Sequence, residues 1–138
     1  MVSNFRNLKR LVYLISPNKI YPNFYAELNK VLSSRKVGFF QLRLKDKSKN
    51  QIIKIAKTAE KISRKYKIPI AIAPPHHLIP LITKFKIMIL AQHMDDKKVG
   101  STTGFMVPEI VKKSKIDGSI INHSEHRISE KEIKSLVK

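Results

Sequence analysis

Short apolar runs alternate with amphipathic segments along the chain, and this alternation constrains the fold more than any other feature. The apolar runs are residues 11–15, 37–44, 68–73, 87–91 and 118–121. Each run has the length of a buried strand and is followed by turn-forming or polar residues. The segments between the runs carry apolar residues at helical spacing. Strands that alternate with helices in this way predict parallel strands joined by right-handed helical crossovers.

The clearest predicted helix begins after Ser48. Ser48 and Gln51 have the spacing of a capping box, in which each residue bonds the backbone of the other. The apolar stripe that follows consists of Ile52, Ile55, Ala56, Ala59, Ile62 and Tyr66. A second capping box at Ser129 and Glu132 predicts a last helix through Val137. Further helices are predicted after Asn23, over residues 78–84 and from Pro108.

The composition limits the kind of protein. A length of 138 residues suits one domain, so we expect a single domain over residues 1–138. No apolar run approaches the ~18 residues that cross a bilayer, and the first residues lack an apolar leader. Absence of cysteine excludes disulfides and thiolate chemistry. These features predict a cytoplasmic protein without a membrane partner.

The chain is strongly basic, with a formal net charge of +18. Such charge is typical of proteins that neutralise nucleic-acid phosphates. However, the cations are 22 Lys and only 6 Arg, and they are spread over all segments. Recognition of phosphates and bases usually relies on the planar fork of arginine. We therefore expect lysines that coat outer helix faces, with nucleic-acid binding as an alternative that a steep salt dependence would reveal.

Polar residues directly after the strands are the candidate functional residues, because ligands of parallel α/β proteins bind at the carboxyl ends of the strands. The residues at these ends are Ser16 and Asn18; Gln41, Arg43 and Lys45; Pro74 to His77; Gln92, His93 and Asp95; and Asn122 to Arg127. The last group is the densest. His123 follows its strand at once, where an imidazole can present a ring nitrogen to a carbonyl group.

Other patterns are weaker. His76 and His77 are adjacent and cannot both point to one site on a strand face. His93 and Asp95 have a spacing that can ligate metal, but no third ligand is evident, so packing within a loop is the favoured interpretation. The segment 98–104 is rich in glycine and hydroxyl groups but lacks the ending of a phosphate-binding P-loop. We predict no metal site.

From about residue 51 to residue 138 the chain resembles triose-phosphate isomerase, especially its compact archaeal type. The stretches that carry the resemblance are Ile72-Ala-Pro-Pro75, Ala91-Gln-His-Met-Asp95, Gly100-Ser-Thr-Thr-Gly104, Pro108-Glu109 with Val111-Lys112, and Asn122-His-Ser-Glu-His-Arg127. The resemblance implies an aldose–ketose isomerisation of a triose phosphate. His123 and Glu125 would be the catalytic residues, with Asn122 and Ser124 beside them at the substrate. The region of Gln92 and 100–104 would pack across a subunit interface.

The same resemblance also implies parts that residues 1–138 do not supply. The family has a catalytic glutamate after its sixth strand and phosphate contacts from its seventh and eighth strands. Its first strand ends in Asn-x-Lys, a place that Arg43 or Lys45 would take here. We therefore expect an isomerase-like chain that is incomplete.

Residues 11–50 resemble a different family, thiamine-phosphate synthase. The resemblance lies in Leu11-Val-Tyr-Leu-Ile-Ser-Pro17 and Phe40-Gln-Leu-Arg-Leu-Lys-Asp46. It implies that Gln41, Arg43 and Lys45 bind a pyrimidine pyrophosphate, with Mg²⁺ as the cofactor. The later Asn-Asp and His-x-Gly signatures of the synthase are absent. This function is the first alternative, and an inactive partial-barrel scaffold is the second.

Taken together, these observations predict the α/β class, with about five parallel (βα) units of the TIM-barrel type. A closed eight-stranded barrel needs roughly 200–250 residues, so we expect a partial barrel. Open strand edges favour pairing with another chain, and we therefore expect a homo-oligomer. The partner would be a small phosphorylated substrate, and no cofactor is expected outside the synthase alternative.

Overall fold

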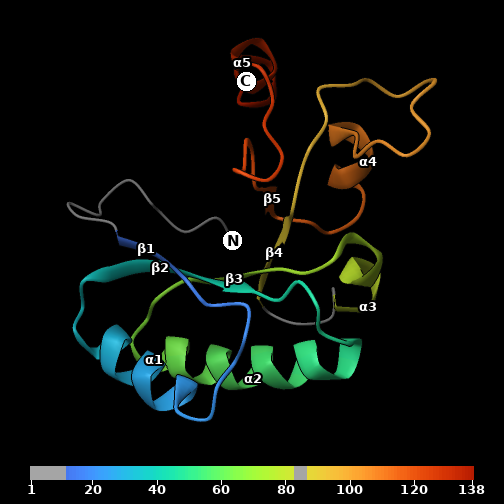
Figure 1. Ribbon diagram of the computed structural model, residues 1–138. Helices are drawn as coiled ribbons and strands as arrows, with labels where there is room; N and C mark the ends of the chain where they lie inside the picture. Colours follow the sequence, from blue (N-terminus) through green and yellow to red (C-terminus); the bar gives the residue numbers. More distant parts are fainter. Residues whose placement is uncertain (1–11, 83–86) are drawn as a thin grey trace. The chain divides into compact units, whose positions relative to one another are not determined.

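The structure, a computed structural model, describes residues 12–82 and 87–138. Its elements in chain order are β1 (Val12–Ile15), α1 (Phe24–Ser33), β2 (Val37–Arg43), α2 (Lys49–Lys65), β3 (Ile70–Ala73), the 3-10 helix η2 (His76–Leu78), α3 (Ile79–Ile82), β4 (Met88–Ala91), α4 (Pro108–Lys112), β5 (Gly118–Ser119) and α5 (Glu130–Leu136) (Figure 1). The strands follow chain order, β1-β2-β3-β4-β5. This order confirms the predicted α/β class with successive (βα) units.

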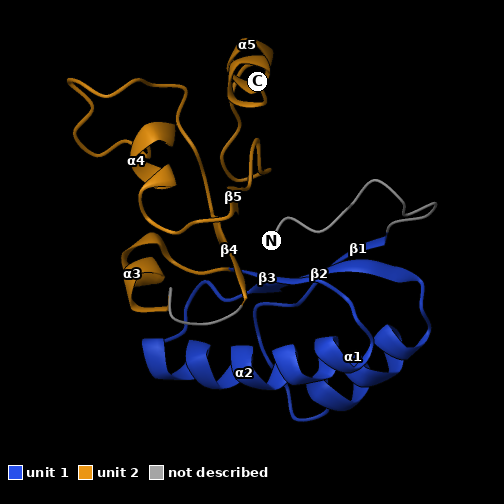
Figure 2. Ribbon diagram, turned by 180° about the vertical axis from the view of Figure 1, so that it is seen from behind, with its two compact units in different colours: residues 1–72 blue, residues 73–138 orange. Residues whose placement is uncertain are grey.

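The chain divides into two compact units, Met1–Ile72 and Ala73–Lys138 (Figure 2). We call them unit 1 and unit 2 and describe each by itself. The boundary lies within β3. The single domain predicted over residues 1–138 stays a prediction.

Unit 1 is organised around β2, which lies parallel to β1, with Leu14 opposite Phe40 and Ile15 opposite Gln41. Residues Val37 to Leu42 of β2 are all buried, and Figure 1 shows α1 and α2 side by side on one side of the strands. The buried helix residues are Phe24, Leu28 and Leu32 of α1, and Ile52, Ile55, Ala56, Ala59 and Ser63 of α2. These helices pack their apolar sides into the core, as their spacing predicts.

Helix α2 confirms the capping box predicted at its start. The backbone N–H of Ser48 donates to Oε1 of Gln51 at 2.9 Å, and the backbone N–H of Gln51 donates to Oγ of Ser48 at 3.4 Å. Two amide groups that have no partner inside the helix are thereby satisfied. In α1, by contrast, Asn23 occupies the predicted N-cap position, but its side chain makes no capping hydrogen bond.

Strand β1 is exposed, and the prediction of a buried strand was wrong. Val12 is 50% exposed and Ile15 is 52% exposed. The physical reason is its place at the end of the strand order, where β2 is its one paired neighbour among residues 12–82 and 87–138. The ring of Tyr13 is covered on one face because it stacks on Phe39, with a centroid distance of 4.8 Å. Leu11, predicted as the first residue of this strand, lies outside the described residues.

Unit 2 has shorter elements. Strands β4 and β5 are parallel, with Leu90 opposite Gly118 and Ala91 opposite Ser119. A Cβ on Gly118 would lie 3.2 Å from a methyl carbon of Leu90, so close strand approach favours glycine here. A small core joins Ala91, Met94 and Val111 to the partly buried Met106, Ile116 and Leu136.

Strand β5 is shorter than the predicted run 118–121. Its ladder continues by one bond, from the backbone N–H of Ile120 to the carbonyl of Ala91 at 2.9 Å. Asn122 then adopts a left-handed backbone with φ of 58°, which turns the chain away. Asparagine is among the few residues that adopt this conformation readily. The chain therefore leaves the strand direction before the end of the predicted run.

The remaining helices follow the prediction with shifted bounds. Residues 78–84 were predicted as a helix, and the structure has η2 and α3 up to Ile82, while 83–86 lie outside the described residues. Helix α4 begins at Pro108, as predicted. Helix α5 follows the capping box of Ser129 and Glu132, and Val137 is its C-cap.

Candidate functional site

His123 lies in a tight turn of unit 2, four residues beyond the end of β5 at Ser119. His123 is partly exposed, and its carbonyl accepts a hydrogen bond from the backbone N–H of His126 at 2.9 Å. The side-chain oxygen of Asn122 accepts from the backbone N–H of Ile128 at 3.2 Å and so closes the wider loop. Arg127 donates from its guanidinium to the carbonyl of Asn122 at 3.2 Å. The loop thus holds its own shape through local bonds.

The ring of His123 has a defined hydrogen-bond partner. The backbone N–H of Glu125 donates to Nδ1 of His123 at 3.1 Å. A nitrogen that accepts a hydrogen bond has a lone pair and no proton, so this contact fits a neutral ring whose proton is on Nε2. Nε2 is then a hydrogen-bond donor. Glu125 and Ser124 are exposed on the same turn.

His93 and His126 form a stacked pair that the sequence did not predict. Their ring centroids are 3.6 Å apart and their planes differ by 13°. His93 is buried, and its Nε2 lies 3.1 Å from Oδ1 of Asp95. Oδ2 of Asp95 accepts from the backbone N–H of Met106 at 2.6 Å. His93 and Asp95 thus contact each other within the loop that follows β4. Over residues 12–82 and 87–138, no group of three or more acidic or histidine side chains is placed to hold a metal ion.

His76 and Gln92 connect two neighbouring strand ends of unit 2. The backbone N–H of Gln92 donates to Nε2 of His76 at 2.9 Å, and the Gln92 amide donates to the carbonyl of Ala73 at 3.0 Å. Burial lowers the pKa of His76 below its ordinary value; the nearby His93 lowers it further, while Asp95 opposes both. A neutral His76 suits its role as an acceptor. His77, in contrast, is exposed, as expected for adjacent histidines.

The candidate anion-binding residues of unit 1 lie at the end of β2. Gln41 is 4% exposed and its Oε1 accepts from the hydroxyl of Tyr13 at 2.6 Å. The backbone N–H of Arg43 donates to Oγ of Ser16, and that of Lys45 to Oδ1 of Asn18, both at 2.9 Å. The polar residues after β1 thus fix the backbone at the end of β2. The side chain of Arg43 is partly exposed and that of Lys45 is exposed.

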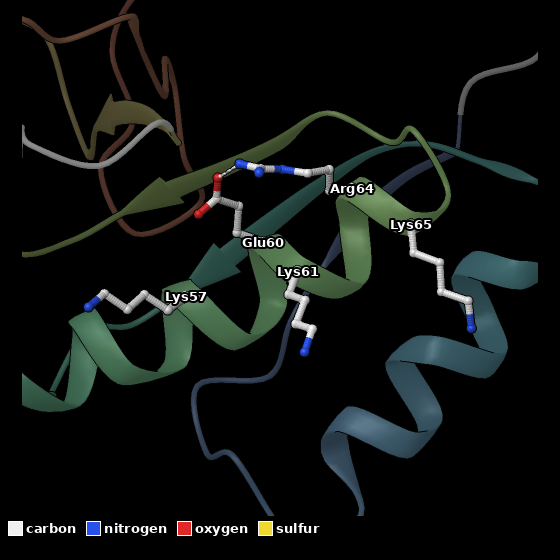
Figure 3. A pocket seen from close by; sticks show the side chains of 5 residues that line it. All are labelled: Lys57, Glu60, Lys61, Arg64 and Lys65. Carbon is white, nitrogen blue, oxygen red and sulfur yellow. Dashed lines mark hydrogen bonds and ion pairs between the residues drawn. The ribbon is translucent and has the colours of Figure 1, made fainter.

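A shallow hollow of about 340 Å³ lies on the outer side of α2. It is lined by Lys57, Glu60, Lys61, Arg64 and Lys65. Figure 3 shows Glu60 paired with Arg64 and the side chains of Lys61 and Lys65 pointing away from that pair. These residues coat a helix face, which matches the expected distribution of lysines. The hollow contains none of the residues predicted for catalysis.

The loop between β4 and α4 exposes two apolar side chains. Val99 is 64% exposed and Phe105 is 45% exposed. Gly104 has φ of 86°, a conformation that glycine adopts without strain, and none of the described residues comes within 4 Å of the position of its missing Cβ. The stretch 98–104, which is rich in glycine and hydroxyl groups, is largely exposed at the surface of unit 2.

Parallel strands in chain order, joined by helices and followed by polar loops, define an α/β protein built of (βα) units. The profile of the triosephosphate isomerase family matches residues 42–138. The chain belongs to the triosephosphate isomerase family.

Curated relatives show the same relationship. The chain is 45% identical over 93 residues to the triosephosphate isomerase of Cenarchaeum symbiosum, which covers 67% of this chain and 42% of that protein. It is 37% identical over 86 residues to the triosephosphate isomerase of Sulfurisphaera tokodaii, covering 62% of this chain and 38% of the relative. The chain therefore spans about two fifths of the length of these relatives.

A second relative is of a different kind. The chain is 52% identical over 61 residues to the thiamine-phosphate synthase of Pelagibacter ubique, covering 44% of this chain and 30% of that protein. Both predicted resemblances are thereby confirmed. The matches of 93 and 61 residues together exceed the 138 residues of the chain, so they overlap. Similarity to the two families is thus not divided sharply at residue 50.

In the part of the chain that the structure describes, no helix is long and apolar enough to cross a membrane.

Proposed function

We propose that the chain carries the carbonyl-polarising part of a triose-phosphate isomerase site, with His123 as the electrophile. The single observation that supports this most is the bond from the backbone N–H of Glu125 to Nδ1 of His123. The reaction would be the aldose–ketose isomerisation of a triose phosphate, and it needs no cofactor. We place it in the cytoplasm.

The chemistry follows from the tautomer. A neutral imidazole that carries its proton on Nε2 donates a hydrogen bond to the carbonyl oxygen of the substrate. This bond draws electron density from the carbonyl group and makes the proton on the neighbouring carbon easier to remove. The family is itself the reference example of a neutral histidine in this role, so the mechanism is carried over to His123 from the family.

Three neighbours of His123 complete the proposal. Glu125 would contribute a carboxylate to the polar surroundings of the substrate. Ser124 is exposed on the same turn and would contact the substrate through its hydroxyl group. Asn122 has its side-chain oxygen engaged with Ile128, so its amide N–H groups are the part that we assign to the substrate.

Complete turnover needs a second group. A carboxylate base must remove the proton from carbon, and the family places that glutamate after a sixth strand. We propose that residues 1–138 bind and polarise the carbonyl group, and that efficient turnover requires a further segment with the base and the phosphate contacts. The expected activity of residues 1–138 alone is therefore low.

The test is a ligand titration of the chain labelled with ¹⁵N in its histidines. Triose phosphate and phosphoglycolate should each shift the Nε2 signal of His123, whereas thiamine precursors should leave it unchanged. His123→Gln should abolish the response, and His77→Gln, at an exposed histidine away from the turn, should preserve it. Silence of His123 toward both phosphorylated ligands would refute the isomerase proposal and favour an inactive scaffold.

The end of β2 supports a second candidate, a thiamine-phosphate-synthase-like anion site. The supporting observation is the 52% identity to such a synthase, together with Arg43 and Lys45 held at one strand end by Ser16 and Asn18. Gln41 would have to exchange its bond with Tyr13 for one with the ligand. A charge-assisted bond to phosphate is worth about 1.5–3 kcal/mol, so Arg43→Gln should weaken binding of a pyrimidine pyrophosphate with Mg²⁺ about tenfold or more. Lack of binding to the unchanged chain in calorimetry would exclude this candidate.

Self-association is the proposed assembly. Exposed Val99 and Phe105 on the loop between β4 and α4, and the exposed edge strand β1, present apolar surface. In the family the corresponding loop packs across a subunit interface. A monodisperse monomer by light scattering at micromolar concentration would contradict this proposal.

A further inference from the structure

The stacked imidazoles of His93 and His126 join a buried residue to an exposed turn. His93 lies two residues beyond β4 and is 9% exposed, whereas His126 lies in the loop after β5 and is exposed. Their centroid distance of 3.6 Å and plane angle of 13° place the rings face to face. Because β4 and β5 are parallel neighbours, the loops after them meet at one edge of the sheet. Both residues belong to unit 2.

The buried ring is fixed by its surroundings. Nε2 of His93 lies 3.1 Å from Oδ1 of Asp95, and the other carboxylate oxygen accepts from the backbone N–H of Met106 at 2.6 Å. The backbone N–H of Asp95 also donates to the carbonyl of Met106 at 3.0 Å. One of these contacts is made by the His93 ring itself, and the other two fix Asp95, its partner. The buried ring of His93 is the fixed surface on which the ring of His126 stacks.

The exposed ring belongs to the same turn as His123. The backbone N–H of His126 donates to the carbonyl of His123 at 2.9 Å, and this bond closes the turn. The N–H of Glu125, which lies inside the turn, donates to Nδ1 of His123. Any displacement of the turn therefore changes the geometry of the bond that selects the tautomer of His123.

We propose that His126 is a positioning residue, whose stack on His93 holds the turn 123–126 so that His123 presents Nε2–H. This inference rests on the proposed function, because it assigns a purpose to the orientation of His123. His126 acts through the turn and is not a catalytic residue. The property required at position 126 is a flat ring that covers His93, and not a titrating group.

The experiment compares two substitutions in the full chain. His126→Phe keeps a flat ring, and His126→Ala removes it. We expect ¹⁵N spectra of the histidine side chains to show His123 with its proton on Nε2 in the unchanged chain and in His126→Phe. In His126→Ala we expect a mixture of tautomers, and about tenfold faster hydrogen exchange of the Glu125 amide, because a constrained turn opens more often once its contact is lost.

Two further variants make the result decisive. His126→Gln removes the ring but keeps a polar side chain, and it replaces His126→Ala in the comparison if the alanine variant unfolds. His77→Ala is the matched control, because His77 is exposed and should leave His123 unchanged. An unaltered His123 tautomer and an unaltered Glu125 exchange rate in both ring-deleted variants would overturn the proposal. The readout needs no ligand, so its failure is distinct from a failure of His123 to respond to triose phosphate.

Discussion

Units 1 and 2 differ in how their residues are used. Unit 1 contains the longest helix and the wholly buried strand residues 37–42, and most of the buried apolar side chains of the described residues belong to it. Unit 2 has a strand of two residues and a last helix in which no residue is buried. Yet unit 2 contains His76, His93, His123 and His126. The comparison teaches that most of the buried apolar core and the candidate histidines lie in different parts of this chain.

The largest expected effect comes from the core of unit 1. Phe40 is 1% exposed, and Phe40→Ala should lower the free energy of unfolding by about 3–5 kcal/mol through lost burial and a cavity. Met94 is the matched position in the smaller core of unit 2, where Met94→Ala should lower it by about 2 kcal/mol. Urea denaturation measures both. A larger loss for Met94→Ala would contradict the contrast between the units.

The pH dependence of stability tests a partly buried histidine of unit 2, His76. Burial lowers the pKa of His76 in the folded state, so the unfolded chain binds the proton more readily. The stability that depends on neutral His76 is therefore fully present above the pKa that His76 has in the unfolded chain. It is lost as the pH falls through the lower pKa of the folded state. In His76→Gln, stability at pH 7.5 should change by about 1 kcal/mol or less, because an amide oxygen can accept from Gln92. The decrease in the free energy of unfolding between pH 7.5 and pH 5, measured by denaturation, should be smaller in this variant than in the unchanged chain. An identical pH profile would refute the assignment.

The two capping boxes provide a matched pair across the units. Ser48→Ala should lower the global free energy of unfolding by about 1 kcal/mol, because α2 is part of the core. Ser129→Ala removes the same bond from α5, which has no buried residue, so its effect should be local fraying. Hydrogen exchange should become faster at Glu132 and Ile133 while the global transition hardly moves. Equal shifts of the global transition would show that α5 is as integrated as α2.

The smallest effects concern the ends of helices. Lys67 and Lys115 follow α2 and α4 with φ of 57° and 53°, a conformation that favours glycine. Replacement by glycine removes backbone strain but adds flexibility to the unfolded chain. The free energy of unfolding should rise by about 0.5 kcal/mol in each variant. Thermal unfolding of Lys67→Gly and Lys115→Gly measures it. A loss of stability in both would mean that the cations at these helix ends outweigh the backbone strain.

The sequence predicts elements best where local and tertiary preferences agree. Helix α2 has its predicted capping box, and Ile52, Ile55, Ala56 and Ala59 of its predicted apolar stripe are buried. Ser48 and Ile52 favour the same helix locally and in the core. Strand β1 is the opposite case: its apolar residues predict burial, but only its place at the sheet edge determines exposure. Strand β5 ends early because of the left-handed Asn122, which its apolar run 118–121 does not reveal.

The candidate site divides in the same way. Spacing and strand order predict His123 directly at a strand end, whereas the structure places it in a turn four residues beyond β5. The stack of His93 on His126 joins residues 33 positions apart, so no local pattern contains it. The signal that could have found it is topological: histidines that follow neighbouring parallel strands are brought to one edge. The roles of Gln41, Arg43, Lys45, Asn122, Ser124 and Glu125 in binding or catalysis stay predictions.

The partner of Nδ1 in His123 is a main-chain amide, and this has a consequence for sequence variation at position 125. Every amino acid other than proline brings the same N–H to that point, so the bond to the imidazole does not depend on which side chain stands there. Replacement of Glu125 can therefore alter the charge of the turn while this main-chain bond is kept.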